Sequence, residues 1–258
     1  VCYPQGTTDS WGDNFWNVGY DFHTGVNVDD VGFIVSLAAY LQSTYQLSTV
    51  NTFFTGMSNG GELCYLLACE TQNVFRAFAP VAGTIFPNGL TNNICNPTIP
   101  VPIFETHGRN DNITLIQGDL FDQYWGPYLS IDTIINFWVN QNSLTSLVID
   151  TFPNLNNNDK ITISYKYSDL STTNEVWLYT HKSGHNWGDD GDVIIEEEIW
   201  SFFSKMSLSN STGLHENYQD RKLIKVFDIL GRQSIERKNT FLFYIYNDGT
   251  AEKRIVIE

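Results

Sequence analysis

The chain has 258 residues, of which 42% are hydrophobic, 14% aromatic and 17% charged. This composition excludes a disordered chain, because the apolar and aromatic side chains can fill a core. No apolar run approaches the roughly 18 to 20 residues of a membrane-spanning helix, so we expect no membrane insertion. The formal net charge of −15 argues against nucleic acid and anionic membranes as partners.

Charge is distributed unevenly along the chain. Residues 1–217 carry 6 Lys/Arg and 23 Asp/Glu, whereas residues 218–258 carry 8 and 6. A segment rich in Ser, Asn and Gly, residues 207–217, precedes this change and is typical of a linker. We therefore predict an α/β domain over 1–206, a linker, and a small C-terminal β module over 218–258.

Hydrophobic periodicity predicts the following elements in chain order: helix 28–47, strand 50–55, helix 59–70, strands 75–81 and 101–106, helix 130–139, strands 147–152, 161–167 and 176–180, and helix 193–206. Strands that alternate with helices favour a mostly parallel sheet with helices on both faces. After the linker the period changes to 2, over 222–230, 241–246 and 254–257, which predicts a small antiparallel unit.

Residues 56–60 (G-M-S-N-G) fit the pattern G-x-S-x-G between a predicted strand and a predicted helix. This is the context of a nucleophile elbow, in which glycines let the helix and the strand pass close to the serine. We predict that Ser58 is a nucleophile and that the backbone N–H of Asn59 stabilises an oxyanion. The alternative is a strand-to-helix turn with no catalytic role.

A serine near its normal pKa is a poor nucleophile and needs a base within hydrogen-bond reach. The base and the acid should follow Ser58 in the order acid, then histidine. His185 lies on a glycine-flanked loop after the last strand of the body and is the predicted base, with His181 as second choice. Asp111 directly follows an apolar strand and is the predicted acid, with Asp150 as second choice and turn capping as its alternative role.

This triad would carry out two-step acyl transfer through an acyl-enzyme. A second oxyanion donor is expected from a loop after an earlier strand, and the sequence contains no such loop. Trp16, Trp125 and Trp187 are candidates to line a cleft for a sugar or phenolic ring, although such residues are more often core. Residues 188–192 (G-D-D-G-D) favour a helix N-cap over a calcium site, and we predict no metal and no cofactor.

The four cysteines are Cys2, Cys64, Cys69 and Cys95. They contain no C-x-x-C pair, so neither a zinc site nor a redox motif is indicated. Cys69 and Cys95 either form a disulfide, as in an exported protein, or are small buried apolar residues.

Five ordered blocks of the body resemble the polyhydroxybutyrate-depolymerase and feruloyl-esterase group of carbohydrate esterase family 1: 28–34 (V-D-D-V-G-F-I), 55–61 (T-G-M-S-N-G-G), 79–83 (A-P-V-A-G), 107–111 (H-G-R-N-D) and 184–187 (G-H-N-W). The resemblance implies an α/β-hydrolase fold and assigns nucleophile, acid and base to Ser58, Asp111 and His185. It also implies that residues 1–4 (V-C-Y-P) form an inner strand, so that the leading strands and their oxyanion loop are missing.

The tail resembles the C-terminal sorting domain of type IX secretion, through 226–232 (V-F-D-I-L-G-R), 246–250 (Y-N-D-G-T) and 253–257 (K-R-I-V-I). That resemblance implies recognition by the secretion machinery and export across an outer membrane. The residues alone indicate only a small β module.

We therefore expect a secreted, extracellular or cell-surface serine esterase that removes feruloyl or acetyl groups from plant polysaccharide. One alternative is a polyhydroxybutyrate-type polyester depolymerase, because a triad does not distinguish acyl groups. The other is a non-catalytic polysaccharide-binding protein on a hydrolase scaffold.

Overall fold

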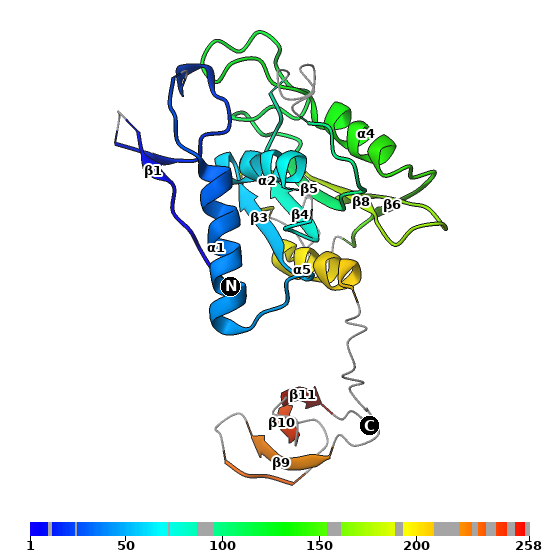
Figure 1. Ribbon diagram of the computed structural model, residues 1–258. Helices are drawn as coiled ribbons and strands as arrows, with labels where there is room; N and C mark the ends of the chain where they lie inside the picture. Colours follow the sequence, from blue (N-terminus) through cyan, green and yellow to red (C-terminus); the bar gives the residue numbers. More distant parts are fainter. Residues whose placement is uncertain are drawn as a thin grey trace. The chain divides into compact units, whose positions relative to one another are not determined.

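The computed structural model describes residues 1–9, 12–23, 25–71, 73–86, 95–153, 161–188, 193–208, 222–228, 232–235, 241–246 and 251–255 (Figure 1). The chain divides into two compact units, Val1–Leu208 and Ser209–Glu258. Each unit is described by itself below.

The larger unit is built on a six-stranded sheet with the order β3-β4-β5-β8-β7-β6. The strands are β3 (Phe53–Met57), β4 (Ala77–Val81), β5 (Ile103–Gly108), β6 (Ser146–Thr151), β7 (Ile163–Ser168) and β8 (Val176–His181). Neighbours from β3 through β8 are parallel, whereas β7 is antiparallel to both β8 and β6. The predicted fold class, a mostly parallel α/β sheet, is confirmed.

Helices cover both faces of this sheet (Figure 1). They are α1 (Asp30–Tyr45), α2 (Asn59–Glu70), α4 (Ile131–Gln141) and α5 (Ile195–Met206). Apolar residues of α1, α2 and α4 form one core with Phe78 and Ile103, and those of α5 form the other with Ala77 and Phe104. Successive residues of β4 and β5 thus face opposite cores, as the period of 2 in a strand requires.

The first residues of the chain differ from the prediction of an inner strand. Residues 1–4 lie outside any strand, and the side chains of Val1 and Tyr3 are exposed. The following segment forms the short strands β1 (Thr7–Thr8) and β2 (Asn14–Phe15) and the single-turn helix η1 (Asp21–His23). With no neighbouring strand to pair with among the described residues, the apolar character of residues 1–4 is not enough to make a strand.

A disulfide joins Cys69, near the end of α2, to Cys95. Of the two alternatives left open by the sequence, a disulfide or two separate buried cysteines, the structure has the disulfide. Cys64 is free and buried, and Cys2 is free and exposed. The bond closes a segment that contains β4 and the residues that directly follow it. No helix within the described residues is long and apolar enough to span a membrane.

The smaller unit contains an antiparallel sheet of β9 (Leu223–Asp228), β10 (Phe241–Tyr246) and β11 (Ala251–Ile255), with β10 in the middle. Val226, Leu242, Tyr244 and Tyr246 form a core of its own. The module predicted over 218–258 therefore has an antiparallel sheet. Most of the predicted linker, residues 209–217, lies outside the described residues.

Candidate active site

Ser58 occupies a tight turn between β3 and α2. Its backbone has φ 56° and ψ −123°, a strained conformation for a residue with a side chain and one typical of a nucleophile elbow. A Cβ on Gly56 would lie 2.5 Å from the carbonyl oxygen of Gly60, and a Cβ on Gly61 would lie 2.8 Å from that of Val81. Gly56 of the motif and Gly61 directly after it are therefore required by the close approach of backbone to backbone, whereas a Cβ on Gly60 would meet nothing within 4 Å.

Asp111 and His185 are joined directly. Nδ1 of His185 lies 2.8 Å from Oδ2 of Asp111, whose side chain is fully buried. The other oxygen, Oδ1, accepts the backbone N–H groups of Ile113 at 2.8 Å and Thr114 at 2.9 Å. Burial alone would raise the pKa of Asp111, but these hydrogen bonds outweigh burial and lower it. Asp111 is thus an ionised carboxylate that orients the imidazole of His185.

The three predicted triad residues follow the carboxyl ends of three parallel strands: Ser58 follows β3, Asp111 follows β5 and His185 follows β8. They therefore share one edge of the sheet. The structure brings the acid and the base into contact. Within the described residues, no hydrogen bond joins the Ser58 hydroxyl to the His185 ring, and hydrogen bonds of this kind are often long before substrate binds.

The second-choice residues lie elsewhere. His181 is the last residue of β8 and is buried. Asp150 lies on the exposed edge strand β6, which β7 separates from β8. The carboxylate–imidazole contact after β5 and β8 is the one between Asp111 and His185.

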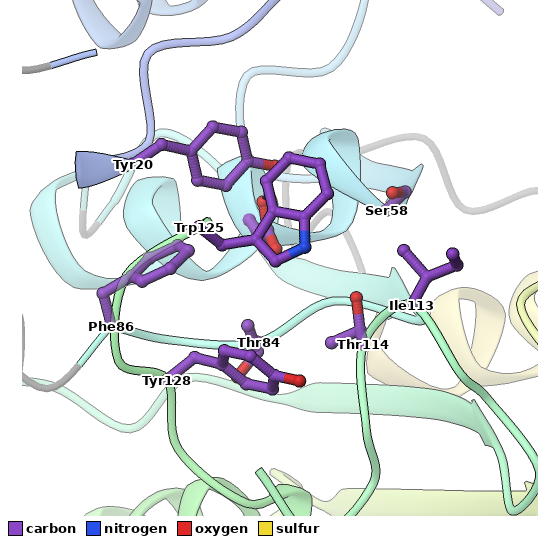
Figure 2. Close-up of a pocket in the computed structure, with 9 residues that line it drawn as sticks. Tyr20, Ser58, Thr84, Phe86, Ile113, Thr114, Trp125 and Tyr128 are labelled. Carbon is purple, nitrogen blue, oxygen red and sulfur yellow. The ribbon is translucent and has the colours of Figure 1, made fainter. Parts of the chain in front are cut away.

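Four of the nine residues that line a pocket next to Ser58 are aromatic (Figure 2). Its lining residues are Tyr20, Ser58, Glu62, Thr84, Phe86, Ile113, Thr114, Trp125 and Tyr128. Trp125 packs against Tyr20 with the ring centroids 5.1 Å apart. Of the three predicted substrate-binding tryptophans, Trp125 alone lines this pocket; Trp16 packs against the core on the α2 side and Trp187 against the core on the α5 side.

A buried polar cluster lies beside the elbow, and the sequence pattern did not predict it. Asn59 accepts the Trp16 N–H at 2.6 Å and donates to the Tyr20 hydroxyl at 3.1 Å, which in turn is hydrogen-bonded to Glu62. Burial raises the pKa of Glu62 to about 8. The only signal in the sequence is a glutamate one turn after Ser58 on an otherwise apolar helix. The cluster attaches the chain before α1 to the helix that presents Ser58.

Asn59 is also the predicted oxyanion donor. It is the first residue of α2, where backbone N–H groups have no acceptor within the helix. The described residues contain no group of three or more His, Cys, Asp or Glu side chains that could hold a metal ion. Residues 189–192, most of the segment weighed as an N-cap or a calcium site, lie outside the described residues.

No family model matches the chain. Feruloyl esterase B of Piromyces equi is 26% identical over 211 residues, which are 81% of this chain and 36% of that protein. The bifunctional acetylxylan esterase/xylanase XynS20E of Neocallimastix patriciarum is 28% identical over 113 residues, 44% of this chain and 15% of that protein. Feruloyl esterase C of Emericella nidulans is 28% identical over 114 residues, 44% of this chain and 39% of that protein. The chain spans well under two thirds of the length of each of these relatives.

Among solved structures, an acetyl xylan esterase from Aspergillus awamori has 13% identity and a TM-score of 0.46, covering 74% of this chain and 73% of that chain. The carboxylesterase of Bacillus cereus has 13% identity and a TM-score of 0.47, covering 79% and 74%. The predicted enzyme class, a carboxylic ester hydrolase, agrees with the sequence relatives. The chain thus combines a mostly parallel α/β sheet and a strand–turn–helix elbow at Ser58 with similarity to feruloyl and acetylxylan esterases.

Proposed function

We propose that the chain is a serine esterase that hydrolyses feruloyl or acetyl esters of plant polysaccharide, with Ser58 as nucleophile, His185 as base and Asp111 as acid. The observation that carries this proposal is the 2.8 Å contact between His185 and a buried, ionised Asp111 at the sheet edge where the Ser58 elbow lies. A carboxylate that orients an imidazole, at the same sheet edge as a serine in a strained turn, is the arrangement that acyl transfer requires.

In the proposed reaction, Nε2 of His185 takes the hydroxyl proton of Ser58 while Oγ attacks the ester carbonyl. The backbone N–H of Asn59 stabilises the oxyanion, and Asp111 stabilises the imidazolium. His185 then gives its proton to the leaving alcohol, which leaves an acyl-enzyme on Ser58. A water molecule deprotonated by His185 attacks the acyl carbon, releases the carboxylic acid and restores the serine.

The pocket next to Ser58 offers aromatic side chains for contact with an acyl ring, but its free volume of about 20 Å³ is that of a water-sized cavity. Tyr20, Phe86, Trp125 and Tyr128 all line it, and aromatic walls favour a planar ring over an extended aliphatic chain. The relatives named feruloyl esterase point to the same acyl group. A polyester of the polyhydroxybutyrate type stays a second substrate, on the strength of the motif resemblance.

We also propose that the chain acts outside the cell and that residues 218–258 direct its export. The tail motifs support this role, and so does a separate compact unit with its own core. Deleting 218–258 should leave catalysis by the purified body unchanged and abolish appearance of the enzyme in the medium of a host with type IX secretion. Loss of activity in the purified body would show that the boundary is wrong.

Labelling with a fluorophosphonate tests the catalytic assignment. We expect the label on Ser58, located by peptide mass spectrometry, and loss of all turnover of methyl ferulate and 4-nitrophenyl acetate in Ser58→Ala. The matched control is Ser143→Ala, because Ser143 is also a serine with positive φ (54°) but lies in the turn after α4. Label on another serine, or turnover that survives in Ser58→Ala, would overturn the proposal.

Turnover assays on several esters distinguish the candidate substrates. Turnover of methyl ferulate or acetylated xylan without clearing of a polyhydroxybutyrate suspension supports polysaccharide esters, and the reverse supports a polyester. A chain that takes no label, yet binds xylan, would favour the non-catalytic binding protein.

A further inference from the structure

Two ionisable side chains lie buried at the end of β5 and take no part in the proposed reaction. Glu105 and His107 are two residues apart, so they face the same side of the sheet, and both side chains are fully buried. Nδ1 of His107 lies 2.9 Å from Oε1 of Glu105. Burying such a pair is costly unless its hydrogen bonds are satisfied. We therefore expect the pair to have a role, and His107 lies only four residues before Asp111.

The hydrogen bonds of the pair account for its protons. Nε2 of His107 lies 2.8 Å from the carbonyl oxygen of Thr114, and since a carbonyl only accepts, Nε2 carries a hydrogen. Oε2 of Glu105 accepts the Tyr65 hydroxyl at 2.9 Å. The contact between Nδ1 and Oε1 therefore holds one shared proton, and the pair has no net charge wherever that proton lies.

The electrostatics of the pair agree with a retained proton. Burial raises the pKa of Glu105 to about 7. Burial alone would lower the pKa of His107, but the hydrogen bond and charge of Glu105 raise it. Both shifts favour keeping the shared proton near neutral pH, with the imidazole end of the pair nearer to Asp111.

Thr114 connects this pair to the acid. Its carbonyl is held by His107 at 2.8 Å, and its N–H donates to Oδ1 of Asp111 at 2.9 Å. Nε2 of His107 also lies 3.6 Å from Oδ2 of Asp111, the oxygen that contacts His185. Both carboxylate oxygens of Asp111 are thus oriented by contacts that lead back to His107.

The sheet anchors the same residues from below. His107 and Gly108 pair with residues 180 and 181 of β8, and the Arg109 N–H donates to the His181 carbonyl at 2.7 Å. Because the backbone of His107 is held in the sheet, loss of its ring would leave the strand in place. The loop that carries Asp111 and Thr114 would change position instead.

We propose that Glu105 and His107 form a positioning pair: through Thr114 they hold Asp111 in the orientation that accepts His185. This inference rests on the proposed function of the same site. The ionisable groups around the pair are Glu62, Cys64 and Tyr65 on α2, and Asp111, Tyr128 and His185 on the loops at the sheet edge.

Two substitutions of His107 test separately its contact with the Thr114 carbonyl and its contact with Glu105. His107→Gln places an amide where Nε2 stands and can still donate to the Thr114 carbonyl. His107→Asn is shorter and loses that bond while keeping an amide beside Glu105. Thr106→Val is the matched control, since Thr106 is the adjacent, equally buried residue on the opposite face and its hydroxyl has no hydrogen-bond partner among the described residues.

Activity should be measured as kcat per active site, counted by fluorophosphonate labelling, so that loss of folded enzyme does not enter. We expect His107→Asn to lower kcat about 10- to 100-fold, the cost of displacing a catalytic group by about 1 Å, with KM within about twofold. His107→Gln should retain more of kcat, and Thr106→Val all of it. A fall in kcat without a change in KM, partly rescued by glutamine, distinguishes a positioning role from a purely structural one.

A kcat per labelled site that is unchanged in His107→Asn would overturn the proposal. If His107→Asn does not fold, Glu105→Gln keeps the size of the side chain but removes the partner charge of His107. The kcat per labelled site should fall there too, and an unchanged value refutes the role. A wild-type chain that takes no label at Ser58 refutes the proposed function itself, before any variant is compared.

Discussion

Replacing Glu62 by glutamine tests the electrostatics of the site through folding stability. Glu62 lies on α2 beneath Tyr20, with 7% of its surface exposed, and its pKa is raised by burial from 4.5 to about 8. Glutamine has the same shape and can still accept the Tyr20 hydroxyl, but it does not ionise. The substitution therefore removes one titration and leaves the packing in place.

The sign follows from where each state holds the proton. Below the unfolded pKa of 4.5, Glu62 is protonated in both states, and its contribution to stability is fully present. Between pH 4.5 and about 8 the unfolded chain ionises while the folded chain does not, so stability falls as pH rises through the folded pKa. Each pKa unit corresponds to about 1.4 kcal/mol. The rise of the Glu62 pKa from 4.5 to about 8 therefore lowers the free energy of unfolding by about 5 kcal/mol above pH 8.

The measurement is urea unfolding of wild type and Glu62→Gln at pH 5.5 and pH 8.5. We expect the stability of Glu62→Gln relative to wild type to increase by about 3 kcal/mol between these pH values. Glu70→Gln is the control, because Glu70 is the exposed last residue of the same helix, and it should show a much smaller change. A Glu62→Gln difference that is the same at both pH values would refute the reasoning, since Glu62 would then ionise equally in both states.

Two further predictions concern the elements that hold the site. Replacing Cys69 and Cys95 by serine opens a loop with a sequence separation of 26, which should lower the free energy of unfolding by about 3.5 kcal/mol by chain entropy, read from urea unfolding; an unchanged midpoint would contradict it. Gly61→Ala would put a Cβ 2.8 Å from the Val81 carbonyl and 3.1 Å from Cα of Gly83, so it should destabilise by about 2 to 4 kcal/mol and reduce labelling of Ser58. Gly60→Ala is its control, since a Cβ there meets nothing within 4 Å.

Local patterns were sufficient for the sheet and for the loops that carry chemistry. The helix predicted over 59–70 is α2, Asn59–Glu70, because its apolar spacing and the elbow before it are both local features. Asp111 and His185 were selected because each follows a strand, and the parallel pairing of β5 with β8 then places the two loops side by side. A rule about strand ends thus predicted a contact between residues 74 positions apart.

The buried polar groups could not be predicted in the same way. Glu62 contacts Tyr20, 42 residues earlier, and Glu105 contacts Tyr65, 40 residues earlier. A glutamate in a helix or near a strand end is usually solvated, and its burial depends on which distant side chain covers it. The prediction of a strand at residues 1–4 was wrong for a related reason. A strand needs a pairing partner, and the apolar pattern does not show whether one is present.

The buried carboxyl groups differ in a way that favours Asp111 as the proposed acid. Burial raises the pKa of Glu62 to about 8 and that of Glu105 to about 7, so each tends to hold or share a proton. Asp111 is buried as well, but two backbone N–H groups and His185 donate to it, and its pKa is lowered. A carboxyl group can stabilise an imidazolium only while it is ionised itself. Among these three groups, the donors on the loop after β5 and His185 itself therefore favour Asp111 for the proposed role.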